Sequence, residues 1–237
     1  MNLEDVLSEL KVLSDPGIKN TLLNHGAIEP VWGVRIGDMK AIIKKIKHNQ
    51  SLALQLFDSG ISDAKYLAGL IADGNKMTKG EIQKWVENSG WSLISNCTVP
   101  LVASESIFGE EMALTWIDSE SELIACSGWN TLSAWVTMKP DHELNLNVYK
   151  KLLERVNKTI AHEQNSVKYA MNGFVISLGT SVAELTIDAM AVAKANGKLT
   201  VFMGKTSCKV PYAPDYLQKI IDKGRIGIKR KTMKCLP

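Results

Sequence analysis

The strongest constraint on the fold is the spacing of apolar residues, which recur every three or four positions along nearly the whole chain. This spacing gathers apolar side chains on one face of an α-helix, whereas a half-buried strand alternates with a period of two. Such alternation is scarce, and only the short run 199–203 has strand character. The chain is therefore predicted to be all-α. The clearest helical stripes are Met39, Ile42, Ile43 and Ile46; Ala64, Leu67, Ala68 and Ile71; Val148, Leu152, Leu153, Val156 and Ile160; and Ala189, Met190, Val192 and Ala193.

Helix boundaries are also visible in the sequence. Thr78 and Glu81 form a capping box, and Asp15 followed by Pro16 marks a helix start. Gly-containing breaks divide the chain into about ten to twelve helices joined by short turns. Helical hairpins that recur about every 40 residues are typical of HEAT-type repeats. We expect one HEAT-like α-solenoid domain of stacked antiparallel hairpins over residues 1–222, with a concave face for an extended partner. A compact, unstacked helical domain is the alternative.

Charge is distributed unevenly along the chain, whose net charge is +3. From Lys223 onward there are six basic residues and no acidic one, whereas the remainder has 22 basic against 25 acidic residues, a balance of −3. The body is therefore not a general binder of polyanions. Residues 223–237 are predicted to form a basic tail, which is either an arm that contacts phosphates or a solvated end.

The sequence offers little support for several other kinds of protein. Residues 1–5 have neither the basic nor the apolar region of a signal peptide, and the apolar runs are too short for a membrane span. Four scattered cysteines and four histidines show no metal-ligand spacing, which favours free thiols in a reducing cytoplasm. Residues 204–206 resemble the end of a P-loop, but Leu199 stands where that loop needs glycine. We expect a cytoplasmic monomer that holds no metal and no cofactor.

Tryptophan usage is skewed, with six Trp against four Phe. Any one tryptophan is expected to be buried, because Trp is highly buried on average, and Trp85 is predicted to lie in the core. Trp91 follows a Gly-containing break, and it is the tryptophan that we expect to be exposed on a working face. Residues 126–135, which include Trp129, are rich in small polar side chains, as at a close helix–helix contact or on the floor of a cleft.

The stretch 162–174 has a similar polar character. Its polar groups lie at a predicted helix start, where backbone N–H groups are able to bind phosphates. The alternative is an ordinary N-terminal cap with a solvated Lys168.

Three segments of the chain resemble the DNA alkylation repair family, the AlkD type of HEAT-like helical DNA glycosylases. Residues 33–40 are similar to the family's early Gly-Val-Arg segment, residues 85–95 to its Trp-centred helix junction, and residues 168–173 to its Arg-Lys-Ala-Ile-Gly-Trp segment. The resemblance covers most of the chain. It implies a HEAT-like fold and hydrolysis of the N-glycosidic bond of cationic N-alkylated purines, in duplex DNA that lies along a basic concave surface.

The family's chemistry, as the resemblance implies it, uses a tryptophan and a carboxylate four residues later to stabilise positive charge on the sugar. Trp91 matches the tryptophan and Ser95 stands at the carboxylate position, so these two are the candidate catalytic residues. A later tryptophan of the family falls on Gly173, and an expected arginine pair falls on residues 130–131. Because Ser95 carries no charge, two other hypotheses stay open: a nucleic-acid-binding paralogue without the chemistry, and a helical-repeat scaffold for proteins.

The candidate DNA contacts come from the segments discussed above and from the run 204–211, which is rich in hydrogen-bond donors. The alternative for this run is a structural loop. They are Arg35, Lys40, Trp129, Lys168, Asn172, Lys205 and Lys209.

Overall fold

The computed structural model describes residues 1–47, 49–202 and 208–234, and it confirms the all-α fold. Thirteen α-helices lie in these ranges, with short 3₁₀ and π segments between them. No strand occurs in the described ranges, and residues 199–202 are irregular, so the strand character predicted for 199–203 is not seen there. Met203 lies outside the described residues. One isolated antiparallel bridge joins Ser14 to Val34.

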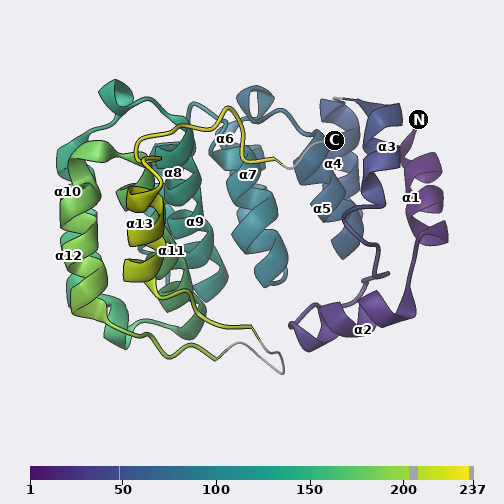
Figure 1. Ribbon diagram of the computed structural model, residues 1–237. Coiled ribbons are helices and arrows are strands. Elements are labelled where there is room, and N and C mark those ends of the chain that lie inside the picture. Colours follow the sequence, from purple (N-terminus) through teal and green to yellow (C-terminus); the bar gives the residue numbers. More distant parts are fainter. Residues whose placement is uncertain (48, 203–207, 235–237) are drawn as a thin grey trace. The chain divides into compact units, whose positions relative to one another are not determined.

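Contacts within the chain define two compact units, the first of which contains residues 1–108 and Lys234. Its centre is α5, which packs against α4 and also contacts α1 and α3 (Figure 1). Most of α5 is buried, from Ser62 to Ala64 and from Leu67 to Ile71. The helices of this unit are α1 (Leu3–Val12), α2 (Pro16–Asn24), α3 (Met39–Ile46), α4 (Gln50–Asp58), α5 (Ser62–Ile71), α6 (Lys79–Glu87) and α7 (Val99–Ala103).

The second unit contains residues 109–202 and 208–233. Its two longest helices, α9 (Glu122–Met138) and α11 (Asn165–Ser181), have 17 residues each and pack against one another. The core at their contact includes the fully buried side chains of Trp129 and Phe174. The other helices are α8 (Gly109–Trp116), α10 (Leu146–Thr159), α12 (Thr186–Asn196) and α13 (Ala213–Asp222). Of these, α8 packs on α9, and α12 and α13 pack on α11.

The predicted domain limits, 1–222 and 223–237, remain a prediction. In the structure, residues 223–233 group with the second unit and Lys234 groups with the first. Among the described residues, no single helix is long and apolar enough to cross a membrane; Asn165–Ser181 and Ala183–Asn196 meet the length and composition criteria only as a pair, across a 120° bend.

The predicted helix starts are present. The Thr78 hydroxyl accepts a hydrogen bond from the Glu81 N–H, and the Glu81 carboxylate accepts one from the Thr78 N–H at 2.8 Å. Pro16 begins α2, and the carboxylate of Asp15 before it accepts hydrogen bonds from two N–H groups of the first turn. These side chains satisfy backbone donors that a helix end leaves without partners.

The small polar residues of α9 are explained by a close contact between helices. An added Cβ at Gly128 would lie 2.8 Å from the Ile117 backbone nitrogen and 2.9 Å from the Ala113 carbonyl oxygen. At Gly128, segment 126–135 therefore forms a close helix–helix contact, which is one of the two roles predicted for it. Three of its polar side chains, those of Ser127, Asn130 and Ser133, donate hydrogen bonds to carbonyls one turn earlier in the same helix.

Gly128→Ala is expected to destabilise the protein by about 1–3 kcal/mol, because the methyl group would force α8 and α9 apart. Gly173→Ala in α11 is the matched control, since an added Cβ there meets nothing within 4 Å. We expect this control to be neutral or to stabilise by up to about 1 kcal/mol, as glycine weakens a helix interior. Urea unfolding followed by circular dichroism compares the two, and equal effects would contradict the close contact.

Candidate nucleic-acid interface

The residues predicted to carry the chemistry lie at a helix junction in the first unit. α6 ends at Glu87, Gly90 has a positive φ of 81°, and a π-helix spans Ile94–Thr98 before α7 begins. Pro100 accounts for the π turn, because proline has no N–H for the carbonyl four residues earlier and its ring clashes with that carbonyl. Pro100 is thus the sequence signal for a segment that helical spacing alone does not reveal.

Trp91 is buried, with 5% of its surface exposed, so the expectation that it is exposed on a working face is wrong. Its indole Nε1–H donates a hydrogen bond to the Ser62 Oγ at 2.6 Å. Ser62, the first residue of α5, is buried as well, and its N–H donates to the Pro30 carbonyl at 3.0 Å. Trp91 therefore lies in the core beside the start of α5. Trp85 lies in the core as predicted, stacked on Phe57 with ring centroids 4.2 Å apart.

Ser95 is fully buried within the π-helix. Its hydroxyl donates to the Ser92 carbonyl at 3.3 Å and lies 3.3 Å from the Asn96 Oδ1. Both of these groups are neutral. A carboxylate at this position would be costly, because an ionised group in an apolar interior needs a charged partner or several strong donors.

The first turn of α5 organises the surroundings of Trp91, and sequence reasoning did not single it out. The buried carboxylate of Asp63 accepts hydrogen bonds from the N–H groups of Trp32 and Val34, each at 2.7 Å. Lys65 donates from Nζ to the Asn88 carbonyl at 2.6 Å, and burial lowers the pKa of its ammonium group. Asp63 has a structural role, because both of its oxygen atoms hold the loop that precedes α3.

Two predicted DNA contacts of the first unit are on its surface. Arg35 is exposed, but its guanidinium pairs with Asp15 at 2.9 Å. Lys40 is exposed on α3, and no ion pair involves it in the described part of the chain. Lys40 is therefore the better placed of the two for a phosphate.

In the second unit, two predicted contacts are buried, and this corrects their expected position on a DNA-facing surface. Trp129 has no exposed surface and packs against Phe174 with ring centroids 5.1 Å apart. The Arg155 guanidinium carbon lies 5.6 Å from the centroid of the same tryptophan. Asn172 is 5% exposed, and its side chain donates to the Pro211 carbonyl at 2.9 Å. Both residues serve packing in this structure.

The start of α11 already holds an anion from the chain itself. The Ser166 N–H donates to the Glu122 carboxylate at 2.6 Å, so a carboxylate occupies part of the place that we considered for a phosphate. Lys168, one turn into the helix, is half-buried, and Lys209 is exposed. Neither has an ion pair within the described ranges. Lys205 lies outside the described residues.

Metal-ligating side chains do not gather in the described part of the chain, where no group of three His, Cys, Asp or Glu is arranged to hold a metal ion. Cys97, Cys126 and Cys208 form no disulfide within the described residues. Burial, with a smaller effect of Glu122, raises the pKa of Cys126 to about 12, so this thiol is poorly suited to act as a nucleophile.

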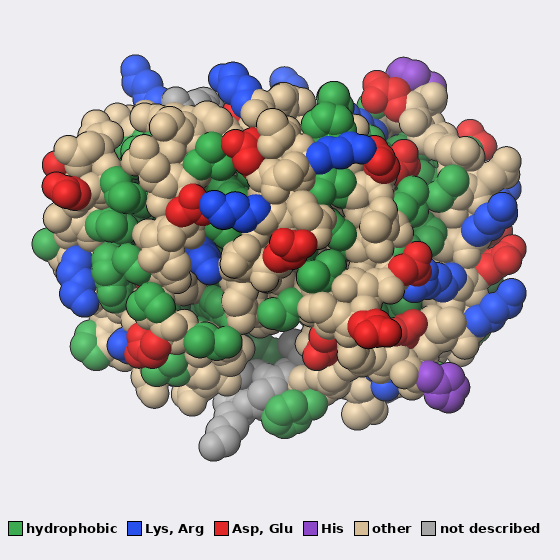
Figure 2. Space-filling model, turned by 180° about the vertical axis from the view of Figure 1, so that it is seen from behind, with side chains coloured by type: hydrophobic (Ala, Val, Ile, Leu, Met, Phe, Trp, Pro, Cys, Tyr) green, Lys and Arg blue, Asp and Glu red, His purple; other side chains and the backbone are tan. Residues whose placement is uncertain are grey.

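Ion pairs neutralise much of the positive charge on the first unit. Lys19 pairs with Glu29, Lys45 with Glu9, and Lys84 with Asp58, at 2.6 to 2.8 Å. Figure 2 shows one face of the molecule, on which Lys and Arg side chains are interspersed with Asp and Glu. The described side chains on that face form no continuous basic track of the kind that follows a nucleic-acid backbone.

Packed helical hairpins around a tryptophan-centred junction define a HEAT-like helical-repeat protein. One solved structure, reported as "A new family of proteins related to the HEAT-like repeat DNA glycosylases with affinity for branched DNA structures", matches with a TM-score of 0.90 and 34% identity, covering 99% of this chain and 100% of that chain. The predicted HEAT-like fold is thereby confirmed. The family model described as DNA alkylation repair enzyme matches residues 6–213, and the chain belongs to this family.

Two curated bacterial proteins are also similar to this chain over most of its length. The uncharacterized proteins Lin0241 of Listeria innocua and Lmo0209 of Listeria monocytogenes are each 35% identical over 221 residues, which is 90% of this chain and 94% of theirs. The similarity therefore covers most of both chains in each case.

Trp91→Phe is expected to lower the free energy of unfolding by about 1–3 kcal/mol beyond the cost of the lost volume, because Ser62 loses its buried donor. Trp135→Phe is the control, since Trp135 is also buried and its Nε1 has no hydrogen-bond partner in the described structure. Chemical unfolding of the two variants measures the difference. If both substitutions cost the same, the hydrogen bond to Ser62 does not stabilise the junction.

Proposed function

We propose that the protein binds DNA, with a preference for branched DNA, and that it does not release alkylated purines. The observation that carries the proposal is Ser95, a buried neutral residue at the position where the glycosylase chemistry needs a carboxylate. The solved relative, which is similar over almost the whole chain, is described as having affinity for branched DNA. Family membership supports DNA as the partner.

Base release would need a negative charge beside the sugar, where positive charge develops as the N-glycosidic bond breaks. Ser95 supplies none, and the nearby carboxylate of Asp63 is occupied by two backbone N–H groups. Trp91 is buried and its N–H is bound to Ser62, so its ring offers little surface to a damaged base. These contacts favour a binding protein over a glycosylase.

The cations without ion pairs support a DNA contact on the second unit. Lys168 and Lys209 have no carboxylate partner among the described residues. In the first unit Lys40 has none either, whereas Lys19, Lys45 and Lys84 are paired. DNA binding requires cations that are free to replace the counterions of phosphates. We place duplex arms of the branched DNA at Lys168 and Lys209, and we propose that the protein acts as a monomer.

Binding to a four-way junction is expected to be about tenfold tighter than binding to a linear duplex of the same sequence. The affinity should fall with salt, with a log–log slope of about −0.9 for each phosphate contacted. Fluorescence anisotropy at several salt concentrations, with each DNA in turn, measures both quantities. Equal affinities for the two DNAs would contradict the preference, and no binding to either would leave the protein-scaffold hypothesis.

Lys168→Gln is expected to reduce the steepness of the salt slope by about one phosphate contact. Lys194→Gln is the matched control, because Lys194 is exposed on α12 and is not assigned to DNA. The two substitutions remove the same charge, so a change shared by both would reflect net charge and would argue against a direct contact at Lys168.

A further inference from the structure

A pocket of about 430 Å³ lies in the second unit, between α11, α13 and the tail segment 225–233 (Figure 1, yellow). This volume is in the range of about 300–1,000 Å³ that is usual for small-molecule sites. Its polar lining includes Arg225, Arg230 and Ser177, and its apolar lining includes Ile176, Ile220 and Ile228. A pocket of this composition suits a ligand that has both an anionic group and an apolar part.

The tail that forms one wall is held in place by backbone hydrogen bonds. The N–H of Gly227 donates to the Thr180 carbonyl, and the N–H of Arg230 donates to the Thr137 carbonyl, both at 2.9 Å. Between them, Lys229 donates to the Val136 carbonyl and pairs with Asp141, both at 2.7 Å. The tail is therefore fixed on α9 and α11, in contrast to the solvated arm that the sequence left as one of two alternatives.

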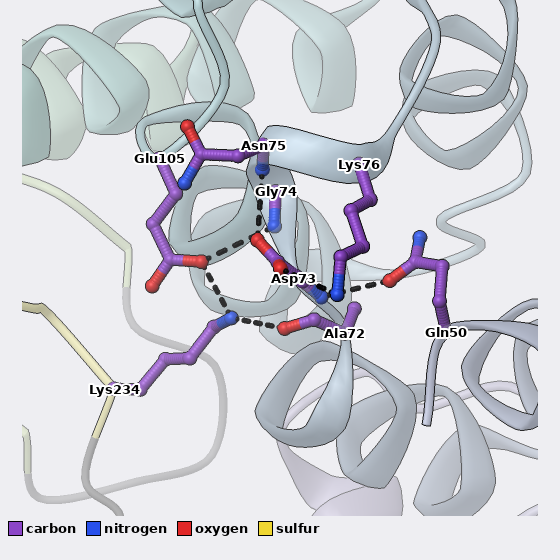
Figure 3. Close-up of polar contacts among 8 residues, drawn as sticks. All are labelled: Gln50, Ala72, Asp73, Gly74, Asn75, Lys76, Glu105 and Lys234. Carbon is purple, nitrogen blue, oxygen red and sulfur yellow. Dashed lines mark hydrogen bonds and ion pairs between the residues drawn. The ribbon is translucent and has the colours of Figure 1, made fainter. Parts of the chain in front are cut away.

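The end of the tail is fixed by a buried lysine in the first unit. Lys234 is 3% exposed at its side chain, and its Nζ donates to the Ala72 carbonyl at 2.5 Å and pairs with Glu105 at 2.6 Å (Figure 3). Glu105 also accepts a hydrogen bond from the Gly74 N–H at 3.4 Å. Because a buried charge is costly without such partners, the pairing holds residue 234 in one place. Within the second unit, the backbone hydrogen bonds of Gly227 and Arg230 restrain segment 225–233.

Two arginines of this segment have guanidinium groups that are accessible to an anionic ligand. Both Arg225 and Arg230 are exposed, and within the described ranges neither guanidinium has an ion pair. The hydroxyl of Ser177 likewise has no hydrogen-bond partner there. Guanidinium groups bind phosphate oxygens in a bidentate manner, and their fixed backbone lowers the entropy that binding would cost.

The pocket also has lining side chains with an apolar surface that are unusually exposed for their type. Tyr216 is 52% exposed and Ile228 is 53% exposed, and both line the pocket. A nucleobase stacks readily on a tyrosine ring, whatever its identity. The arrangement of phosphate-binding and stacking groups within one pocket is that of a nucleotide site.

We propose that this pocket binds a nucleotide, with its phosphate held by Arg225 and Arg230 and its base packed against Tyr216. The nucleotide is either a unit of a DNA strand or a free nucleoside monophosphate, and both present the same chemistry. The DNA form rests on the proposed function, whereas the free form does not.

The test compares the double variant Arg225→Gln/Arg230→Gln with Lys150→Gln/Lys151→Gln, which removes two exposed charges from α10 that have no ion pair with any described residue. For a free nucleotide, titration calorimetry with deoxyadenosine monophosphate is expected to show at least tenfold weaker binding in the arginine variant only. For a DNA unit, the salt slope for junction binding should become shallower by about two phosphate contacts in that variant only. Tyr216→Ala should weaken the nucleotide about tenfold but leave inorganic phosphate unaffected.

Either of the two arginine-specific losses supports the pocket and identifies the source of its nucleotide. The proposal is overturned if both ligands bind the arginine variant as they bind the lysine control, or if neither ligand binds the wild-type protein. Junction binding that is intact in the arginine variant, without nucleotide binding by the wild type, would overturn the pocket while the proposed function stands. Thermal midpoints of all variants should match the wild type, since the substituted side chains are exposed or half exposed.

Discussion

The hydrogen bond from Trp91 to Ser62 is the interaction on which the helix junction depends. It joins the segment after α6 to the first turn of α5, where Asp63 holds the loop before α3 and Lys65 holds the carbonyl of Asn88. A buried indole N–H without a partner would cost free energy, and so would the buried hydroxyl of Ser62. The polar groups around Trp91 therefore form hydrogen bonds within the core, and those bonds leave them less able to bind a ligand.

The same junction has a serine at position 95, where the resemblance to the DNA alkylation repair family led us to expect a carboxylate. Ser95 lies fully in the interior, within the π turn that precedes Pro100, and its hydroxyl donates to the neutral carbonyl of Ser92. Stabilising a cationic sugar is an electrostatic task, which a hydroxyl cannot perform as a carboxylate does. On our proposal that the protein binds DNA, a site without this charge favours recognition of the shape and the phosphates of the partner over cleavage of a bond in it.

The helices were predictable from the sequence because local signals encode them: the apolar spacing, the Thr78–Glu81 capping box and the Pro16 start. The family was predictable from three short segments. The burial of Trp91, Trp129 and Asn172 was not, since their partners Ser62, Phe174 and Pro211 lie far away in the chain. The pairing of Lys234 with Glu105 spans 129 positions, and the basic composition of the tail does not indicate such a partner.

The most direct test of this account is a single-turnover measurement of base release, with protein in excess over a methylated duplex or junction and above the measured dissociation constant. Under these conditions every DNA molecule is bound, so a weak affinity cannot hide the chemistry. We predict that methylated purine appears at the rate of the protein-free control. Release clearly above that rate, reduced by Trp91→Phe in a folded variant, would contradict the assignment of the Trp91–Ser95 junction to the core.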